Sequence, residues 1–224
     1  IGLCLLCSAI ISFIAIQLRS VQENNVVLDM QKKIVSSAGL DEVYGSVENA
    51  MSNIKTLIID LDRGEIVDIN PDTYELSKEL REDGKYKFLS AEEDVASIKK
   101  REKYSKVYIE YKDNEINTLI LPVRGYGLWG ILYGYLAIEG DFNTVAGLEF
   151  YEHKETPGLG AEIDNPKWKA LWKGKKIYQE NGEVSLKVIK GSVMKTSYNF
   201  SYEIYGFSGA TLTCNVVSNL IAYW

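Results

Sequence analysis

The sequence predicts an α+β fold: an antiparallel sheet core with flanking helices, preceded by one N-terminal transmembrane helix. Three observations support this prediction. An uncharged apolar run occupies residues 1–18. Short segments rich in β-branched and aromatic residues, separated by turn residues, fill the middle of the chain. Helical patterns stand apart from these strands, chiefly at the two ends of the chain, which favours a segregated α+β arrangement.

Length, composition and charge limit the classes of function. The chain has 224 residues, enough for one domain with an appendage and a full core. Its net charge of −6 argues against nucleic acid as a partner, because phosphate binding needs clustered Lys and Arg. Three cysteines are too few for a disulfide scaffold.

The apolar run at the amino end is predicted to be a membrane anchor over residues 1–19. Its first charged residue is Arg19, and as a helix the run would span about 27 Å, close to the hydrocarbon thickness of a bilayer. The exit "AIQLRS" lacks the A-x-A pattern of a cleaved signal peptide. One Arg followed by acidic residues favours a domain outside the cytoplasm. Cys4 and Cys7 form a C-x-x-C pair here, which we interpret as packing residues rather than a redox or metal pair.

A stalk helix is predicted over residues 20–40, and the remaining residues, 41–224, form the soluble domain. Apolar residues in the stalk recur at a helical period, and Gly39 is a stop signal. In the domain, strands are expected in 56–69, with a turn at 62–64, and in 106–123, with a hairpin turn at Asp113–Asn114. Further elements are a solvated loop and helix over 72–103, a strand over 144–153, a helix over 165–178 and a strand over 182–191.

The stretch 116–138 is apolar enough to be considered as a second membrane span. Pro122, Arg124 and four glycines argue against a span. We therefore predict strand, tight turn, strand, with the glycines allowing the backbone to approach a flat or bulky group.

Two polar loops are candidates for a binding site. The first, "HKETPGLGAEI" (153–163), has Pro157 to restrict a turn and two glycines that permit close backbone approach. The second, "YGFSGATLT" (205–213), leads into a helix over 212–224. Free N–H groups at such a helix start suit a phosphate, and a threonine hydroxyl there could bind or be esterified by it. Simple N-capping remains an alternative on this motif alone.

"GFSGA" also resembles the G-x-S-x-G nucleophile elbow of hydrolases. That fold requires an acid and then a His after the nucleophile, and the residues after Ser208 contain neither. The single histidine, His153, lies upstream, and we interpret it as a structural or rim residue. A hydrolase is therefore disfavoured.

The two loops together, "ETPGLGAEIDNPKWKALWKGKKIY" and "SGATLT", resemble the C subunit of the Na⁺-translocating NADH:quinone reductase. The resemblance extends over nearly the whole chain, including the anchor, "SSAGL" and "GYGLWG". It implies one membrane helix in the bacterial inner membrane and an FMN-binding domain on the periplasmic side. The alternative is the G subunit of the Rnf complex, which shares the ETPGLG and GAT elements but usually lacks "NPKWKALWKGKKIY".

The resemblance also implies the site. Thr211 would carry FMN through a phosphoester installed by a flavin transferase that uses FAD, and the ETPGLG loop would lie against the flavin ring. Where the family motif usually has Asp, three residues before the Ser, this chain has Tyr205. The expected cofactor-binding residues are Thr211, Ser208, Gly209, Ala210, Leu212, Thr213, Glu155, Thr156, Gly158, Leu159, Gly160 and Trp129.

The function implied by the resemblance is electron transfer without a substrate, catalytic residue or metal site of its own. FMN would take single electrons from an iron–sulfur centre and pass them to the flavin of the neighbouring B subunit. The expected partners are the B, D and E subunits and their neighbours, the flavin transferase and the membrane. A membrane-anchored sensor or ligand-binding domain is the alternative from another class; it would use the same anchor and sheet but would bind its ligand noncovalently.

Overall fold

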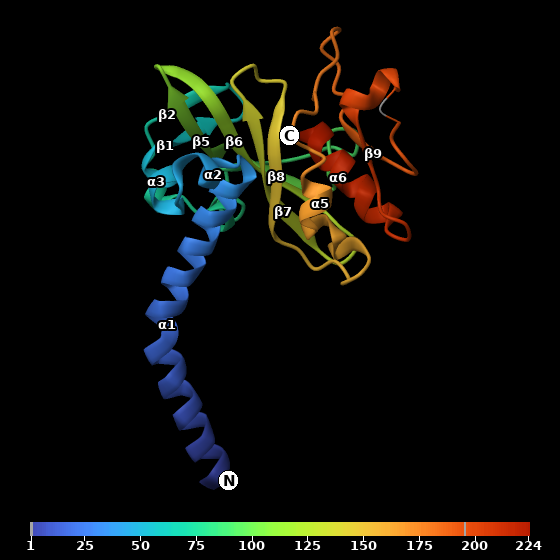
Figure 1. The fold of residues 1–224 in the computed structure, drawn as a ribbon. Coiled ribbons are helices and arrows are strands. Elements are labelled where there is room, and N and C mark those ends of the chain that lie inside the picture. The colour runs from blue at the N-terminus through green and yellow to red at the C-terminus, as the bar shows by residue number, and fades with distance from the viewer. Residues whose placement is uncertain (1, 195) are drawn as a thin grey trace.

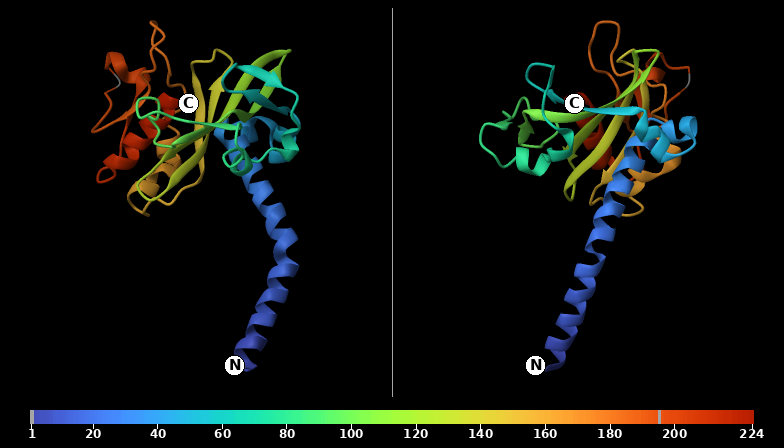
Figure 2. Two further views of the ribbon diagram at one scale, coloured as in Figure 1. Left: turned by 180° about the vertical axis from the view of Figure 1, so that it is seen from behind. Right: turned by 90° about the vertical axis from the view of Figure 1, so that its left-hand side faces the viewer.

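The computed structural model describes residues 2–194 and 196–224, and it shows a long helix projecting from a mixed domain (Figure 1). Helix α1 (Gly2–Ser37) is, by length and composition, the one helix in this described part that could cross a membrane. Its most apolar 18-residue window is entirely exposed. Both views of Figure 2 show it extending away from the domain. The domain from which this helix projects has an antiparallel sheet core with flanking helices, so the α+β prediction is confirmed.

Anchor and stalk are one continuous helix in the structure, without a break between residues 19 and 20. Gly39 follows its end with φ of 65°, a left-handed conformation that glycine adopts without penalty. Two short helices come next, α2 (Leu40–Tyr44) and α3 (Val47–Ser52). Ser46 caps α3, since its hydroxyl accepts a hydrogen bond from the Asn49 N–H at 3.2 Å.

Six strands form one sheet in the order β2-β1-β5-β6-β7-β8, and every neighbouring pair is antiparallel. The apolar stretch 116–138 falls in two paired strands, β6 and β7. The prediction of strand, turn and strand is therefore confirmed, and this stretch is not a second membrane-spanning helix. The β5–β6 turn has positive φ at Asp113 and Asn114, which matches the twist of the flanking strands. The strands are β1 (Ile54–Asp60), β2 (Glu65–Val67), β5 (Tyr104–Lys112), β6 (Glu115–Tyr126), β7 (Ile131–Glu139) and β8 (Val145–Glu152).

The charge-rich segment 72–103 contains more order than the sequence predicts. Besides 3₁₀-helix η1 (Pro71–Thr73) and helix α4 (Leu76–Glu79), it holds a two-stranded ribbon of β3 (Tyr86–Phe88) and β4 (Lys100–Glu102). Glu102 is buried and forms an ion pair with buried Arg124 of β6. The prediction of a solvated face is wrong at Glu102, because its cation lies on a distant strand that local charge alternation cannot reveal.

The carboxyl-terminal third covers one face of the sheet. The helix expected over 165–178 is only α5 (Pro166–Lys169), because Gly174 turns the chain and Lys176 pairs with Thr144 as a β-bridge. The strand expected over 182–191 is β9 (Lys187–Ile189), paired in parallel with β10 (Glu203–Tyr205). The remaining elements are η2 (Gly160–Asp164), η3 (Tyr198–Tyr202) and α6 (Thr211–Tyr223).

Two hydrophobic cores lie on opposite faces of the sheet, as the alternation of side chains along β7 requires. Leu136 joins the larger core, with the buried rings of Trp168 and Trp172 and the inner face of α6. Its neighbours Tyr135 and Ala137 join the smaller core, beneath the end of α1 and the short helices after it. The end of α1 and helix α6 therefore pack on opposite faces of the same sheet.

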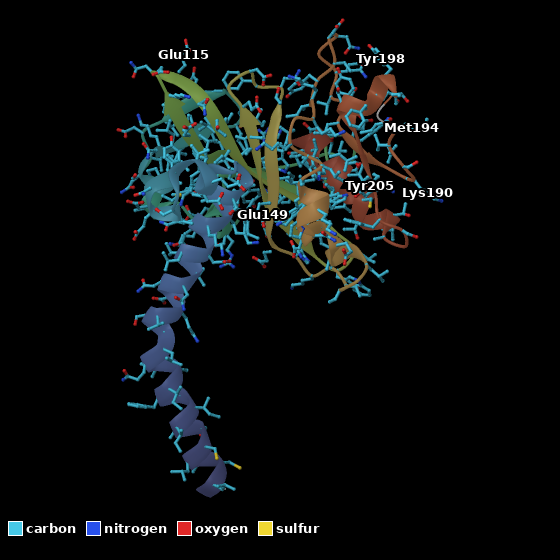
Figure 3. The ribbon with its side chains drawn as sticks, in the orientation of Figure 1. Glu115, Glu149, Lys190, Met194, Tyr198 and Tyr205 are labelled. Atoms are coloured by element: carbon cyan, nitrogen blue, oxygen red, sulfur yellow. The ribbon has the colours of Figure 1, made fainter. Side chains whose placement is uncertain are left out.

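The end of α1 packs closely on β8. A side chain at Gly147 would overlap the Ser37 carbonyl, so glycine permits the approach of the helix. Two residues along lies the buried Glu149, which Figure 3 labels beside the end of α1. Its carboxylate contacts the Lys33 ammonium of α1 at 2.7 Å and the Lys169 ammonium of α5 at 2.6 Å. These contacts attach α1 to the same strand that supports α5.

Candidate functional site

The two polar loops that the sequence singles out come together beside the β6–β7 turn. They border a hollow of about 200 Å³. Ten of the twelve expected cofactor-binding residues line it; Ser208 and Gly158 do not. Leu128 is an additional lining residue, and the "GYGLWG" stretch could have indicated it. The full lining is Leu128, Trp129, Glu155, Thr156, Leu159, Gly160, Gly209, Ala210, Thr211, Leu212 and Thr213.

Helix α6 presents a free amino-terminal end to this hollow. Its first intrahelical hydrogen bond runs from the Cys214 N–H to the Ala210 carbonyl at 3.1 Å. Within the described chain, no acceptor pairs with the N–H groups of residues 211–213, and no side chain caps the helix. Free N–H groups at the positive end of a helix form a site for an anion such as a phosphate. The capping alternative is therefore wrong for these hydroxyls.

The two threonines of the loop have opposite environments. Thr211, the first residue of α6, is exposed. Thr213 is 2% exposed, and its hydroxyl donates a hydrogen bond of 2.6 Å to the Glu155 carboxylate. Ser208 is exposed but lies before the helix and outside the hollow. Thr211 is thus the threonine of this loop whose hydroxyl is accessible at the anion site.

Glu155 lies at the base of the hollow and connects three segments. Its side chain is 5% exposed, and besides Thr213 it accepts a hydrogen bond from the Leu128 N–H at 3.0 Å. Gly160 makes this packing possible, because a Cβ there would overlap the Glu155 carboxylate and lie 2.5 Å from the Thr213 hydroxyl. The sequence indicated a polar group in this loop but not its partners, which lie 27 and 58 residues away.

The rim of the hollow is apolar and exposed. Trp129 is 62% exposed and Leu159 is 46% exposed, and Leu128 and Leu212 are exposed beside them. Leu159 follows the turn at Gly158, whose φ of 75° is left-handed. Single exposed apolar residues are ordinary, but four around one hollow form a surface suited to a flat apolar group.

A second, larger hollow of about 890 Å³ lies on the other side of Thr211. It is lined by residues 188–193, by Tyr205 to Gly209, and by Thr211, Cys214 and Asn215 at the start of α6 (Figure 3 labels Lys190 and Tyr205). Tyr205 borders it, and the Tyr205 carbonyl accepts a hydrogen bond from the Trp168 indole at 2.9 Å. The sequence did not indicate this hollow, since its two walls are about fifteen residues apart in a turn-rich segment.

Cys214 and His153 have structural roles. Cys214 is buried in the larger core, its sulfur accepts a hydrogen bond from the Phe207 N–H at 3.3 Å, and burial raises the pKa of its thiol. His153 contacts the Asp164 carboxylate at 2.7 Å and accepts a hydrogen bond from the Glu155 N–H at 3.2 Å. These contacts agree with the interpretation of His153 as a structural residue and give no support to a hydrolase.

Comparison with known proteins agrees with this geometry. The sequence model of the FMN-binding domain matches residues 127–224, the part that carries the first hollow. The C subunit of the Na(+)-translocating NADH-quinone reductase of Pseudomonas aeruginosa is 46% identical over 226 residues, covering 99% of this chain and 87% of the relative. The chain belongs to this C-subunit family. The Vibrio vulnificus member is 40% identical over 225 residues, covering 100% of this chain and 87% of the relative.

Solved structures of the C-subunit family share the fold. The crystal structure of NqrC from Shewanella oneidensis matches with a TM-score of 0.78 at 29% identity, covering 87% of this chain and 89% of that one. The C subunit from Parabacteroides distasonis matches with a TM-score of 0.65 at 28% identity, covering 92% of each chain. The resemblance to the C subunit is confirmed over its alternative, the Rnf G subunit.

Proposed function

We propose that this chain is the electron-transfer subunit of a Na⁺-pumping NADH:quinone reductase and carries FMN through a phosphoester on Thr211. In this role it relays single electrons from an iron–sulfur centre to the flavin of the B subunit, in contact with the D and E subunits. The observation that carries the proposal is the accessible Thr211 hydroxyl at the free amino-terminal end of α6, beside an apolar-rimmed hollow in an FMN-binding domain.

The residues of the hollow fit the two ends of FMN. The N–H groups of residues 211–213 suit its phosphate, and the helix end attracts negative charge. Leu159 and Trp129 offer apolar surface to a ring, and the turn at Gly158 brings backbone groups to the same rim. When bound, FMN supplies the redox chemistry, while the protein tethers and orients it and supplies the surrounding charges.

Covalent attachment is the property that tests the proposal. The full chain is expressed with and without the flavin transferase, denatured, and separated by gel electrophoresis. We expect ultraviolet fluorescence of the denatured band only with the transferase, because a covalent flavin survives denaturation. A sensor domain with a noncovalent ligand would give a dark band under both conditions, and this result would reject the proposal.

The ring is expected in the smaller hollow, against Leu159, and not in the larger one. Leu159→Ala should therefore raise the quenching of the attached flavin's fluorescence by iodide, because the ring loses apolar cover. The matched control is Val193→Ala, which removes an apolar side chain from the larger hollow. Increased quenching in Val193→Ala with native quenching in Leu159→Ala would place the ring on the other side of Thr211.

The domain is expected on the periplasmic side of the inner membrane, with α1 as a single-pass anchor. A protease added to intact spheroplasts should then digest the chain beyond about residue 37, where α1 ends. A cytoplasmic protein is monitored in the same sample as a control for lysis. Protection in intact spheroplasts with digestion after lysis would show the opposite orientation.

A further inference from the structure

We infer that Glu155 is a positioning residue that orients the Thr211 end of α6 and holds a fixed negative charge beside the bound flavin. The inference rests on the proposed function and deepens it. Its basis is that the carboxylate binds two neutral donors from two different segments, the Thr213 hydroxyl at 2.6 Å and the Leu128 N–H at 3.0 Å.

The first part of the inference concerns geometry. Thr213 lies two residues after Thr211 in the first turn of α6, so the Glu155 hydrogen bond restrains the rotation of that turn about the helix axis. With Thr213 held inward, Thr211 faces outward, since residues two apart on a helix point in different directions. The Leu128 hydrogen bond ties the same carboxylate to the turn that carries Trp129. Both walls of the hollow therefore depend on one side chain.

The second part concerns charge. Among the other buried glutamates, Glu79, Glu102 and Glu149 each contact a Lys or Arg. Glu110 resembles Glu155 instead, since its carboxylate accepts from the neutral Tyr44 hydroxyl and Asn117 amide, but it lies outside the hollow. No cation within the described residues lies within ion-pair distance of Glu155. The Leu128 N–H can only donate, and the Thr213 hydroxyl donates to the carboxylate, so both hydrogen bonds are of the kind that an ionised carboxylate accepts. Its charge is therefore not neutralised by an ion pair.

A negative charge at the base of the hollow should lower the reduction potential of a flavin bound there. Reduction adds negative charge to the ring, and two like charges in a poorly solvated site repel each other more than in water. Charge near the ring is one of the means by which a protein adjusts a flavin's electronics. The hollow is lined by Glu155 and otherwise by uncharged side chains.

Two substitutions separate position from charge. Glu155→Gln retains the length of the side chain; its carbonyl oxygen can accept from Leu128, and its amide can donate to the Thr213 hydroxyl. Glu155→Ala removes both hydrogen bonds. The matched control is Glu162→Gln, the same change of charge on a half-buried glutamate nearby that does not line the hollow.

The full chain with its transferase is followed by intact mass for the rate of FMN attachment and by redox titration of the attached flavin. Glu155→Gln should slow attachment much less than Glu155→Ala does, because it can retain both hydrogen bonds, and it should shift the midpoint potential to a more positive value. Glu155→Ala should slow attachment by about tenfold or more, because small misplacements of a reacting hydroxyl are costly. Glu162→Gln should match the wild type in both measurements.

An unchanged potential in Glu155→Gln would overturn the charge effect, and a wild-type rate in Glu155→Ala would overturn the positioning role. If the wild type itself gains no flavin on Thr211, the proposed function fails separately. The positioning role is then decided on the flavin-free chain by amide hydrogen exchange at Leu128. Faster exchange in Glu155→Ala than in Glu155→Gln supports it, and equal exchange in both overturns it.

Discussion

Thr211→Ala is expected to abolish covalent FMN completely, because a phosphoester requires a side-chain hydroxyl at the attachment point. Thr211 is exposed at the first position of α6, beside three N–H groups without acceptors in the described chain. These groups and the helix dipole would add about 0.3–1 kcal/mol of noncovalent stabilisation to the phosphate. Intact-mass measurement after expression with the flavin transferase detects the FMN adduct directly.

Two hydroxyl residues of the same loop serve as controls. Ser208→Ala should keep the adduct, since Ser208 lies outside the smaller hollow. Thr213→Ala should also keep it on Thr211, although attachment should be slower because the hydrogen bond to Glu155 is lost. An adduct that persists in Thr211→Ala and disappears in Thr213→Ala would move the attachment point by two residues.

Gly160→Ala is expected to damage both stability and flavin attachment. Its Cβ would overlap the Glu155 carboxylate and lie 2.5 Å from the Thr213 hydroxyl. Forcing these buried groups apart should lower the free energy of unfolding by about 1–3 kcal/mol. The same displacement should slow FMN attachment, because it breaks the hydrogen bonds that orient the start of α6. Urea unfolding of the flavin-free chain measures the first effect, and intact mass measures the second.

Gly158→Ala is the matched comparison in the same loop. Gly158 has φ of 75°, so alanine there costs about 1–2 kcal/mol of backbone strain. A Cβ at Gly158 would meet no atom within 4 Å, so the Glu155 hydrogen bonds should survive. Attachment should therefore stay close to the wild-type rate in Gly158→Ala. Slow attachment in Gly158→Ala with a native rate in Gly160→Ala would show that the loop packs differently.

Local sequence signals predicted most of the fold. The Asp113–Asn114 turn, the two glycine-rich strands and the helix after Thr211 all have strong short-range patterns, and the structure contains each of them. The predictions were less accurate where a distant partner decides the conformation. Residues 170–178 are not helical because Lys176 pairs with Thr144, and Glu102 is buried because Arg124 is its partner.

The sequence by itself determined the class of fold, the membrane-competent helix and the two loops that border the smaller hollow, because periodicity and turn chemistry are local properties. It also indicated Thr211, but through the resemblance to a family. Only the tertiary structure revealed the different environments of Thr211 and Thr213, since burial and the hydrogen bond to Glu155 arise from segments 58 residues apart. It likewise distinguished Gly160 from Gly158, which look alike in the sequence, because the space around a glycine is a property of packing.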